Sequence, residues 1–135
     1  MKQFAPVGYQ SVTPYFIVSN ADQMIEFLVT AFYAEELNRH TDETGTVTHA
    51  EVRIGDTVVE ISEGNDRFPS RVNTLHVFVE NTDDCFKRAL DAGAETLYEP
   101  SDMPYGERSG GIVDPFGNHW YIATFTKGSG SGYYG

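Results

Sequence analysis

Residues 114–124 read DPFGNHWYIAT, and the rest of the chain can be arranged around this stretch. Asp-Pro followed by Gly-Asn is typical of a turn, and the residues after it alternate as in a strand with one face on a core. Trp120 and Ile122 fall on one side of that strand, and His119 and Tyr121 fall on the other. An imidazole and a phenol on one face suit a pocket wall, although a solvated sheet face has the same pattern.

The composition predicts one acidic, cytoplasmic domain. The chain has 135 residues, 40% of them hydrophobic, which is enough for one ordinary core. It has no apolar run of about 18 residues, the stretch MKQFAPVGYQ lacks the apolar core of a signal peptide, and the lone Cys85 cannot form an internal disulfide. A net charge of −11 argues against nucleic acid as a partner and weakly favours cationic or neutral ligands. The alternative is that the negative charge only keeps a small protein soluble.

The chain repeats a β-α-β-β-β pattern. In the first copy, a strand over 12–19 is followed by a helix that Asn20 with Asp22 is expected to cap, and the second copy has Asn81 with Asp83 at the same places. An offset of 61 positions superimposes the starts of the two copies, and after a one-residue slip Ala34-Glu35 aligns with Ala94-Glu95. The other expected strands of the first copy are 35–40, 46–54 and 57–62, and the second copy begins with a strand over 74–80.

The repeat predicts an α+β fold in which two tandem βαβββ modules form a curved mixed sheet with a concave cleft. We expect one domain over residues 1–126, with module one at about 9–63, a linker at 64–71 and module two at 72–126. Residues 127–135, KGSGSGYYG, look like a linker and tag.

Side-chain alternation divides the strands into an apolar face under the helices and a mixed concave face. The concave face is expected to carry Thr13, Tyr15, Ile17, His49, Glu51, Arg53, Val58, Glu60, Thr74, His76, Phe78, Ile112, His119 and Tyr121.

The repeat, together with the stretches DPFGNHWYIAT, THAEVRIGD and PYGERSGG, resembles the vicinal-oxygen-chelate superfamily. That superfamily includes glyoxalase I, bleomycin-resistance proteins and extradiol dioxygenases, and within it the chain looks most like the PhnB-like branch. The resemblance implies a homodimer with two clefts and, in many members, a divalent metal held by four side chains.

The four metal positions that the resemblance implies fall on Thr13, Glu60, Thr74 and Tyr121. Only Glu60 is a strong ligand for a divalent ion, because threonine hydroxyls and neutral tyrosine are poor donors. We therefore expect no metal at the usual position and no cofactor.

A displaced metal site is the alternative. His49, His76 and His119 all fall on the expected concave face beside Glu51 and Glu60, and three imidazoles with a carboxylate could hold zinc or iron if they converged. Histidines that merely form hydrogen bonds on a sheet face would have the same spacing.

Residues 101–111, SDMPYGERSGG, are expected to form a loop that caps the cleft. Tyr105 could then stack on a ligand and Arg108 could pair with an anion, unless Arg108 only fixes the loop through an ion pair with a glutamate.

The first helix has two departures from the family pattern. Tyr33 stands where the second copy has Gly93, and family members commonly have glycine there and a Phe-Tyr pair in place of Phe27-Leu28. A left-handed helix end at Tyr33 would cost about 1 kcal/mol.

The predicted function is that of a metal-free, dimeric protein that binds a small cationic or aromatic molecule. Tyr15, Phe78 and Tyr121 would form its walls, and Glu51 and Glu60 its acidic floor. The alternative is a lyase, isomerase or dioxygenase that uses a divalent metal or Glu60 as general base. Cys85 is expected to pack in the core rather than to act as a nucleophile.

Overall fold

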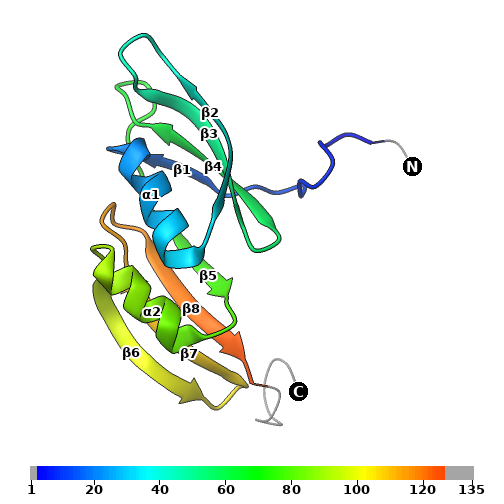
Figure 1. The fold of residues 1–135 in the computed structure, drawn as a ribbon, viewed down its shortest axis with the longest axis vertical. Helices are drawn as coiled ribbons and strands as arrows, with labels where there is room; N and C mark the ends of the chain where they lie inside the picture. Colours follow the sequence, from blue (N-terminus) through cyan, green and yellow to red (C-terminus); the bar gives the residue numbers. More distant parts are fainter. Residues whose placement is uncertain (1–2, 127–135) are drawn as a thin grey trace. The chain divides into compact units, whose positions relative to one another are not determined.

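The computed structural model describes residues 3–126, which form two four-stranded sheets and two helices (Figure 1). The first copy of the repeat contains β1 (Tyr15–Val18), α1 (Ala21–Phe32), β2 (Glu35–Thr41), β3 (Val47–Ile54) and β4 (Thr57–Glu63). The second copy contains β5 (Thr74–Phe78), α2 (Thr82–Asp91), β6 (Glu95–Met103), β7 (Glu107–Val113) and β8 (His119–Phe125). The expected linker and tag over 127–135 lie outside the described residues.

The two sheets have the same topology, which confirms the repeat and the α+β fold. Their strand orders are β1-β4-β3-β2 and β5-β8-β7-β6. β1 is parallel to β4 and β5 is parallel to β8, while the other neighbouring strands are antiparallel. The offset of 61 positions also relates their register, since Tyr15 lies beside Glu60 and His76 lies beside Tyr121. Each module closes its own mixed sheet.

The chain divides into two compact units at Arg71, with one exception in α1. The last turn of α1, Thr30–Phe32, belongs to the second unit. There the ring of Phe32 lies 4.7 Å from the ring of Trp120, centroid to centroid. The tryptophan of the opening stretch is therefore a core residue, as its place in the alternation predicts.

In the first unit the apolar faces of α1, β1, β3 and β4 are buried. The fully covered side chains include Phe16, Leu28, Val52 and Ile61. In the second unit the core includes Cys85 and Phe86 of α2, which packs across β6, β7 and β8. Leu75 and Val77 alternate with the concave-face residues of β5 and so fall on its apolar face, but they are only partly buried.

The DPFGN turn is fixed by the carboxylate of Asp114, which is 3% exposed. It accepts hydrogen bonds from the backbone N–H of Phe116 and of Asn118, both at 2.9 Å, and from Trp120 Nε1 at 2.9 Å. Gly117 has φ +93°, a conformation that suits glycine. The turn thus sets the face on which each residue of β8 lies.

The two helices begin differently. Asn81 caps α2 as predicted, because its side chain accepts a hydrogen bond from Asp84 N at 3.0 Å. The same prediction for Asn20 is wrong, since Asn20 is left-handed (φ 76°) and its side chain makes no capping bond. The carboxylate of Glu63 on β4 caps α1 instead, and it accepts hydrogen bonds from the backbone N–H of Asn20 at 2.8 Å and of Ala21 at 2.9 Å.

Both helices are followed by a left-handed residue. Tyr33, with φ 56°, follows α1 directly, and Gly93, with φ 108°, follows α2 after Ala92, which has φ −89°. Leu28 is fully buried in the core. Nothing in the structure connects Tyr33 with a function.

The predicted loop over residues 101–111 is wrong. β6 continues to Met103 and β7 begins at Glu107, so the segment is a hairpin with a short turn at Gly106 (φ 101°). Pro100 and the turn-forming residues after it favour a loop by their local propensity. The antiparallel pairing of β6 with β7 overrides that propensity.

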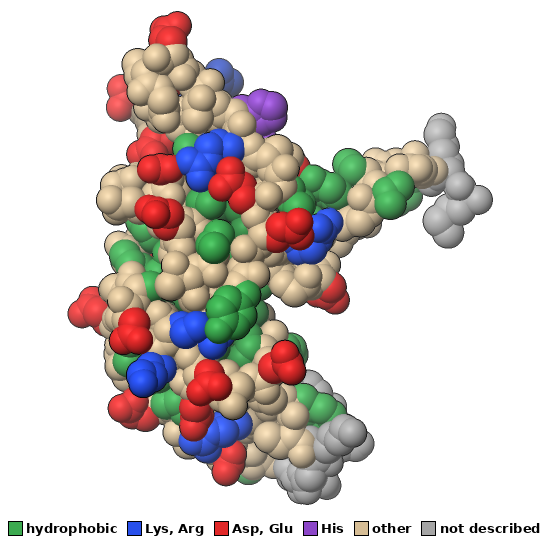
Figure 2. Space-filling model, in the orientation of Figure 1, with side chains coloured by type: hydrophobic (Ala, Val, Ile, Leu, Met, Phe, Trp, Pro, Cys, Tyr) green, Lys and Arg blue, Asp and Glu red, His purple; other side chains and the backbone are tan. Residues whose placement is uncertain are grey.

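Acidic side chains are spread over the face drawn in Figure 2, with fewer basic ones between them. Within residues 3–126, neither helix has the length and apolarity that a membrane crossing requires.

Candidate functional site

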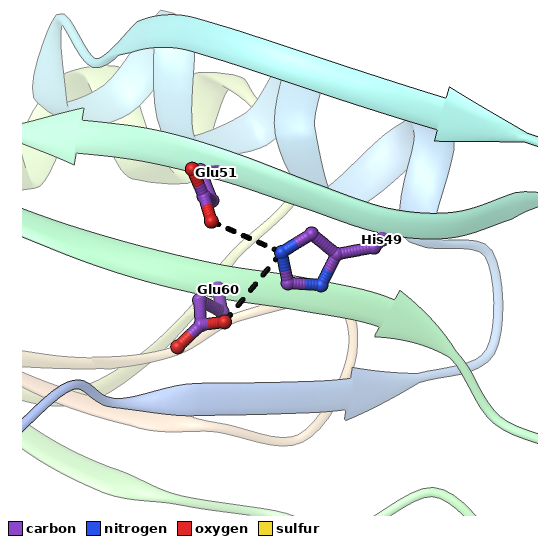
Figure 3. A group of neighbouring side chains, drawn as sticks. All are labelled: His49, Glu51 and Glu60. Atoms are coloured by element: carbon purple, nitrogen blue, oxygen red, sulfur yellow. Dashed lines mark hydrogen bonds and ion pairs between the residues drawn. The ribbon is translucent and has the colours of Figure 1, made fainter. Parts of the chain in front are cut away.

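Three side chains of the first unit come together on the face of the sheet opposite the apolar core (Figure 3). His49 Nε2 lies 3.1 Å from Glu51 Oε2 and 3.5 Å from Glu60 Oε1. One donor atom from each side chain lies within 4.8 Å of the other two. We call these three residues the His49 cluster.

The arrangement follows from strand geometry. His49 and Glu51 are two residues apart on β3, so they share a face, and Glu60 lies directly opposite Glu51 on β4. The turn at Gly55-Asp56 sets this register, and Gly55 has φ +59° there. Once the hairpin closes in this register, the three side chains must be neighbours.

Glu51 is held by groups from outside the cluster. Its Oε1 accepts hydrogen bonds from the Tyr9 hydroxyl at 2.5 Å and from Asn38 Nδ2 at 2.6 Å. Donation from Tyr9, and then from His49 and Asn38, lowers the pKa of Glu51, and burial opposes this shift. The same bond raises the pKa of Tyr9. Glu51 is therefore a fixed, ionised carboxylate at neutral pH.

A groove of about 580 Å³ opens beside the cluster in the same unit. Tyr15 is adjacent to both the groove and the His49 cluster. Its ring lies 6.1 Å from the ring of His49, centroid to centroid, and it also lines the groove. The other lining residues are Ile17, Asp42, Thr46, Val47, Thr48, Ser62, Glu63, Gly64, Asn65 and Phe68. Its two aromatic side chains, Tyr15 and Phe68, are 43% and 53% exposed.

In the second unit, His76 is paired with a buried carboxylate. Its Nε2 lies 3.1 Å from Glu107 Oε2, and Glu107 is 1% exposed. The ring of His76 lies 4.7 Å from that of Phe78, and Tyr121 is its neighbour in register. Glu107 could not be predicted as a partner of His76, because its segment was expected to be a loop and a loop residue has no assigned face of a strand.

The remaining predicted residues do not join the His49 cluster. Thr13 precedes β1 and accepts a hydrogen bond from Gln10 Nε2 at 3.3 Å. Thr74 and His119 are neighbours in register between β5 and β8 of the second unit. Of the three histidines considered for a displaced metal site, the structure brings only His49 to Glu51 and Glu60, and no second group of this kind occurs within residues 3–126.

Arg108 is held by two aspartates rather than by a glutamate. Its Nε and Nη2 lie 2.8 and 3.1 Å from the carboxylate of Asp83, and Nη1 lies 3.3 Å from Asp102. These bonds raise its pKa further. Tyr105 lies in the hairpin turn beside it.

The donor set at the usual metal position does not fit a divalent ion. Thr13 and Glu60 belong to the first unit, and Thr74 and Tyr121 to the second. Each unit thus supplies one threonine hydroxyl, and the only strong ligand of the four is Glu60.

Cys85 offers no nucleophile. It is completely buried, and burial raises the pKa of its thiol to about 11. Its Sγ lies 3.3 Å from the carbonyl oxygen of Ala31 in the same unit. The thiol stays protonated at neutral pH and packs, as expected.

Comparison with known proteins places this fold among described families. Residues 9–122 match the sequence model of the Glyoxalase/Bleomycin resistance protein/Dioxygenase superfamily. An uncharacterized protein of Mycobacterium bovis is 35% identical over 123 residues, which cover 83% of this chain and 81% of that protein.

Two solved structures share the fold at lower identity. TioX from Micromonospora sp. ML1 superimposes with a TM-score of 0.71 at 22% identity, covering 85% of this chain and 95% of TioX. The PhnB protein from Bacillus cereus superimposes with a TM-score of 0.63 at 15% identity, covering 85% of this chain and 99% of that protein.

Proposed function

Because the chain belongs to the glyoxalase/bleomycin resistance protein/dioxygenase superfamily, we propose that it is a dimeric protein that binds a small molecule on the open face of its first sheet. The favoured ligand is a cationic or polar aromatic compound. No metal at Thr13, Glu60, Thr74 and Tyr121 takes part. Sequestration of such a compound is the activity that we propose.

The groove beside β1 and β4 carries this proposal. Its volume of about 580 Å³ lies within the ~300–1,000 Å³ of typical small-molecule sites. Tyr15 and Phe68 offer aromatic surface for stacking, while Thr48, Ser62 and Asn65 offer hydrogen bonds. This combination of apolar walls and a few polar groups is typical of a binding site for an organic molecule.

The preference for a cation rests on charge. The His49 cluster places two carboxylates beside Tyr15, and the chain as a whole has a net charge of −11. A cationic ring stacked on Tyr15 would be attracted both by the aromatic face and by the carboxylates. An anionic ligand would meet repulsion at the same place.

The test is titration with proflavine, a planar cationic dye whose fluorescence reports binding. We expect Glu60→Gln to weaken binding about tenfold, or ~1.4 kcal/mol, and Phe68→Ala to weaken it as well. Glu26→Gln is the matched control, because Glu26 is exposed on α1 and the change of charge is the same. Glu63→Gln is unsuitable as a control, since Glu63 caps α1 and lines the groove. Equal effects of Glu60→Gln and Glu26→Gln would exclude the acidic preference, and absence of saturable binding would exclude the proposal.

An enzyme that uses Glu60 as general base is the second candidate. The observation in its favour is the contact of Glu60 with His49 at 3.5 Å, since an imidazole next to a carboxylate can relay a proton. The two candidates differ in turnover. Incubation of a bound compound with the protein, followed by NMR of the released compound, should return it unchanged if the protein only binds.

A further inference from the structure

We propose that the His49 cluster binds one divalent transition-metal ion, of the zinc or manganese class, at a place other than the family's usual metal position. The donors are His49 Nε2, Glu51 Oε2 and Glu60 Oε1. This inference goes beyond the proposed function, which assigns an organic ligand to the groove.

The spacing of the donor atoms fits a single ion. Zinc lies about 2.1 Å from nitrogen and carboxylate ligands, and a tetrahedral arrangement at that distance separates the ligand atoms by roughly 3–3.5 Å. The two separations from His49 Nε2, 3.1 Å to Glu51 and 3.5 Å to Glu60, agree with this geometry. An imidazole with two carboxylates is also a chemically suitable donor set for such ions.

The electrostatics of the hairpin favour a bound cation. Glu51 and Glu60 are directly opposite each other on β3 and β4, and like charges in that position destabilise a sheet. His49 lies 3.1 Å from Glu51 and 3.5 Å from Glu60, and an imidazole carries at most one positive charge against their two negative charges. A divalent ion would reduce the repulsion between the two carboxylates.

The position of Glu51 is fixed from outside the cluster. Tyr9, from the segment before β1, and Asn38, from β2, both donate to Oε1, so that Oε2 is the atom turned to His49. Outer hydrogen bonds of this kind orient the carboxylate ligands of metal sites.

The proposed site is distinct from the four family-equivalent positions. Two of its three ligands lie on β3, which carries none of those positions, and the only shared residue is Glu60. Three protein ligands leave at least one coordination position for water or for a ligand atom. The ring of Tyr15 lies 6.1 Å from the ring of His49 and also lines the groove.

The test is isothermal titration of the full chain, stripped with a chelator and dialysed, with Zn²⁺ and with Mn²⁺. We expect one ion per chain, and at least tenfold weaker binding in His49→Gln. His76→Gln is the matched control, because His76 is the other imidazole held by a carboxylate, and it should bind as the wild type does. Absorption of the Co²⁺-loaded protein should show a four- or five-coordinate spectrum that His49→Gln lacks.

A second variant protects this result against misfolding. If circular dichroism shows that His49→Gln is unfolded, Glu60→Gln replaces it with the same expectation. No saturable binding, or equal binding by wild type and by the folded variant, overturns the inference. Phe68→Ala separates it from the proposed function, since this variant should lose proflavine affinity and keep the ion. Dye binding without an ion would overturn only the metal site, and an ion without dye binding only the proposed function.

Discussion

At the scale of single residues, the ionisation of Glu51 is set by its hydrogen bonds. Its pKa lies below the ordinary value of 4.5, chiefly because Tyr9 donates to it. A carboxylate with a lowered pKa stabilises the protein above the pKa of the unfolded chain, and this contribution is lost as the pH falls through the folded-state pKa. We therefore predict that Glu51→Gln lowers the free energy of unfolding by about 1–2 kcal/mol at pH 7.

Urea unfolding at a series of pH values measures this effect. The difference between wild type and Glu51→Gln should shrink as the pH falls below 4.5, whereas Glu26→Gln should differ little from wild type throughout. A difference that stays constant down to pH 3 would contradict the assignment to the ionised carboxylate.

At the scale of elements, the start of α1 depends on a strand that follows it in the chain. Glu63 accepts from the backbone N–H groups of Asn20 and Ala21, and its negative charge lies at the positive end of the helix. We predict that Glu63→Ala lowers the free energy of unfolding by about 1 kcal/mol, and that Glu63→Gln, which keeps an acceptor, lowers it by less. Thermal and urea unfolding provide the measurement, and Asn20→Ala should have a smaller effect because its side chain does not cap. An equal loss in Asn20→Ala and Glu63→Ala would contradict this account.

At the scale of the whole molecule, we predict a homodimer. Large apolar side chains remain exposed on strands of both units, with Tyr15 at 43% and Phe78 at 54% exposure. Association of two copies would remove such surface from water. Light scattering after size-exclusion chromatography should give twice the chain mass of 15.0 kDa at micromolar concentration. A mass of 15.0 kDa over the whole concentration range would contradict the dimer.

Much of the fold could be predicted from local signals. The cap at Asn81, the turn at Asp114 and the alternation along β3 are properties of short segments, and the structure has them where the sequence places them. The predictions failed where a distant partner replaced a local one. Glu63 caps the start of α1 although it lies 43 residues from Asn20 in the sequence. The end of β6, which is rich in turn-forming residues, is a strand because it pairs with β7.

The repeat and the residue types on the open faces of the sheets follow from the amino-acid sequence alone, because periodicity and capping act over a few residues. Which of those residues meet depends on the tertiary structure. Glu51 and Glu60 are neighbours of His49 because of the register of one hairpin, while His76 pairs with the buried Glu107. Register and burial depend on contacts between segments far apart in the chain, and no pattern within one strand contains them.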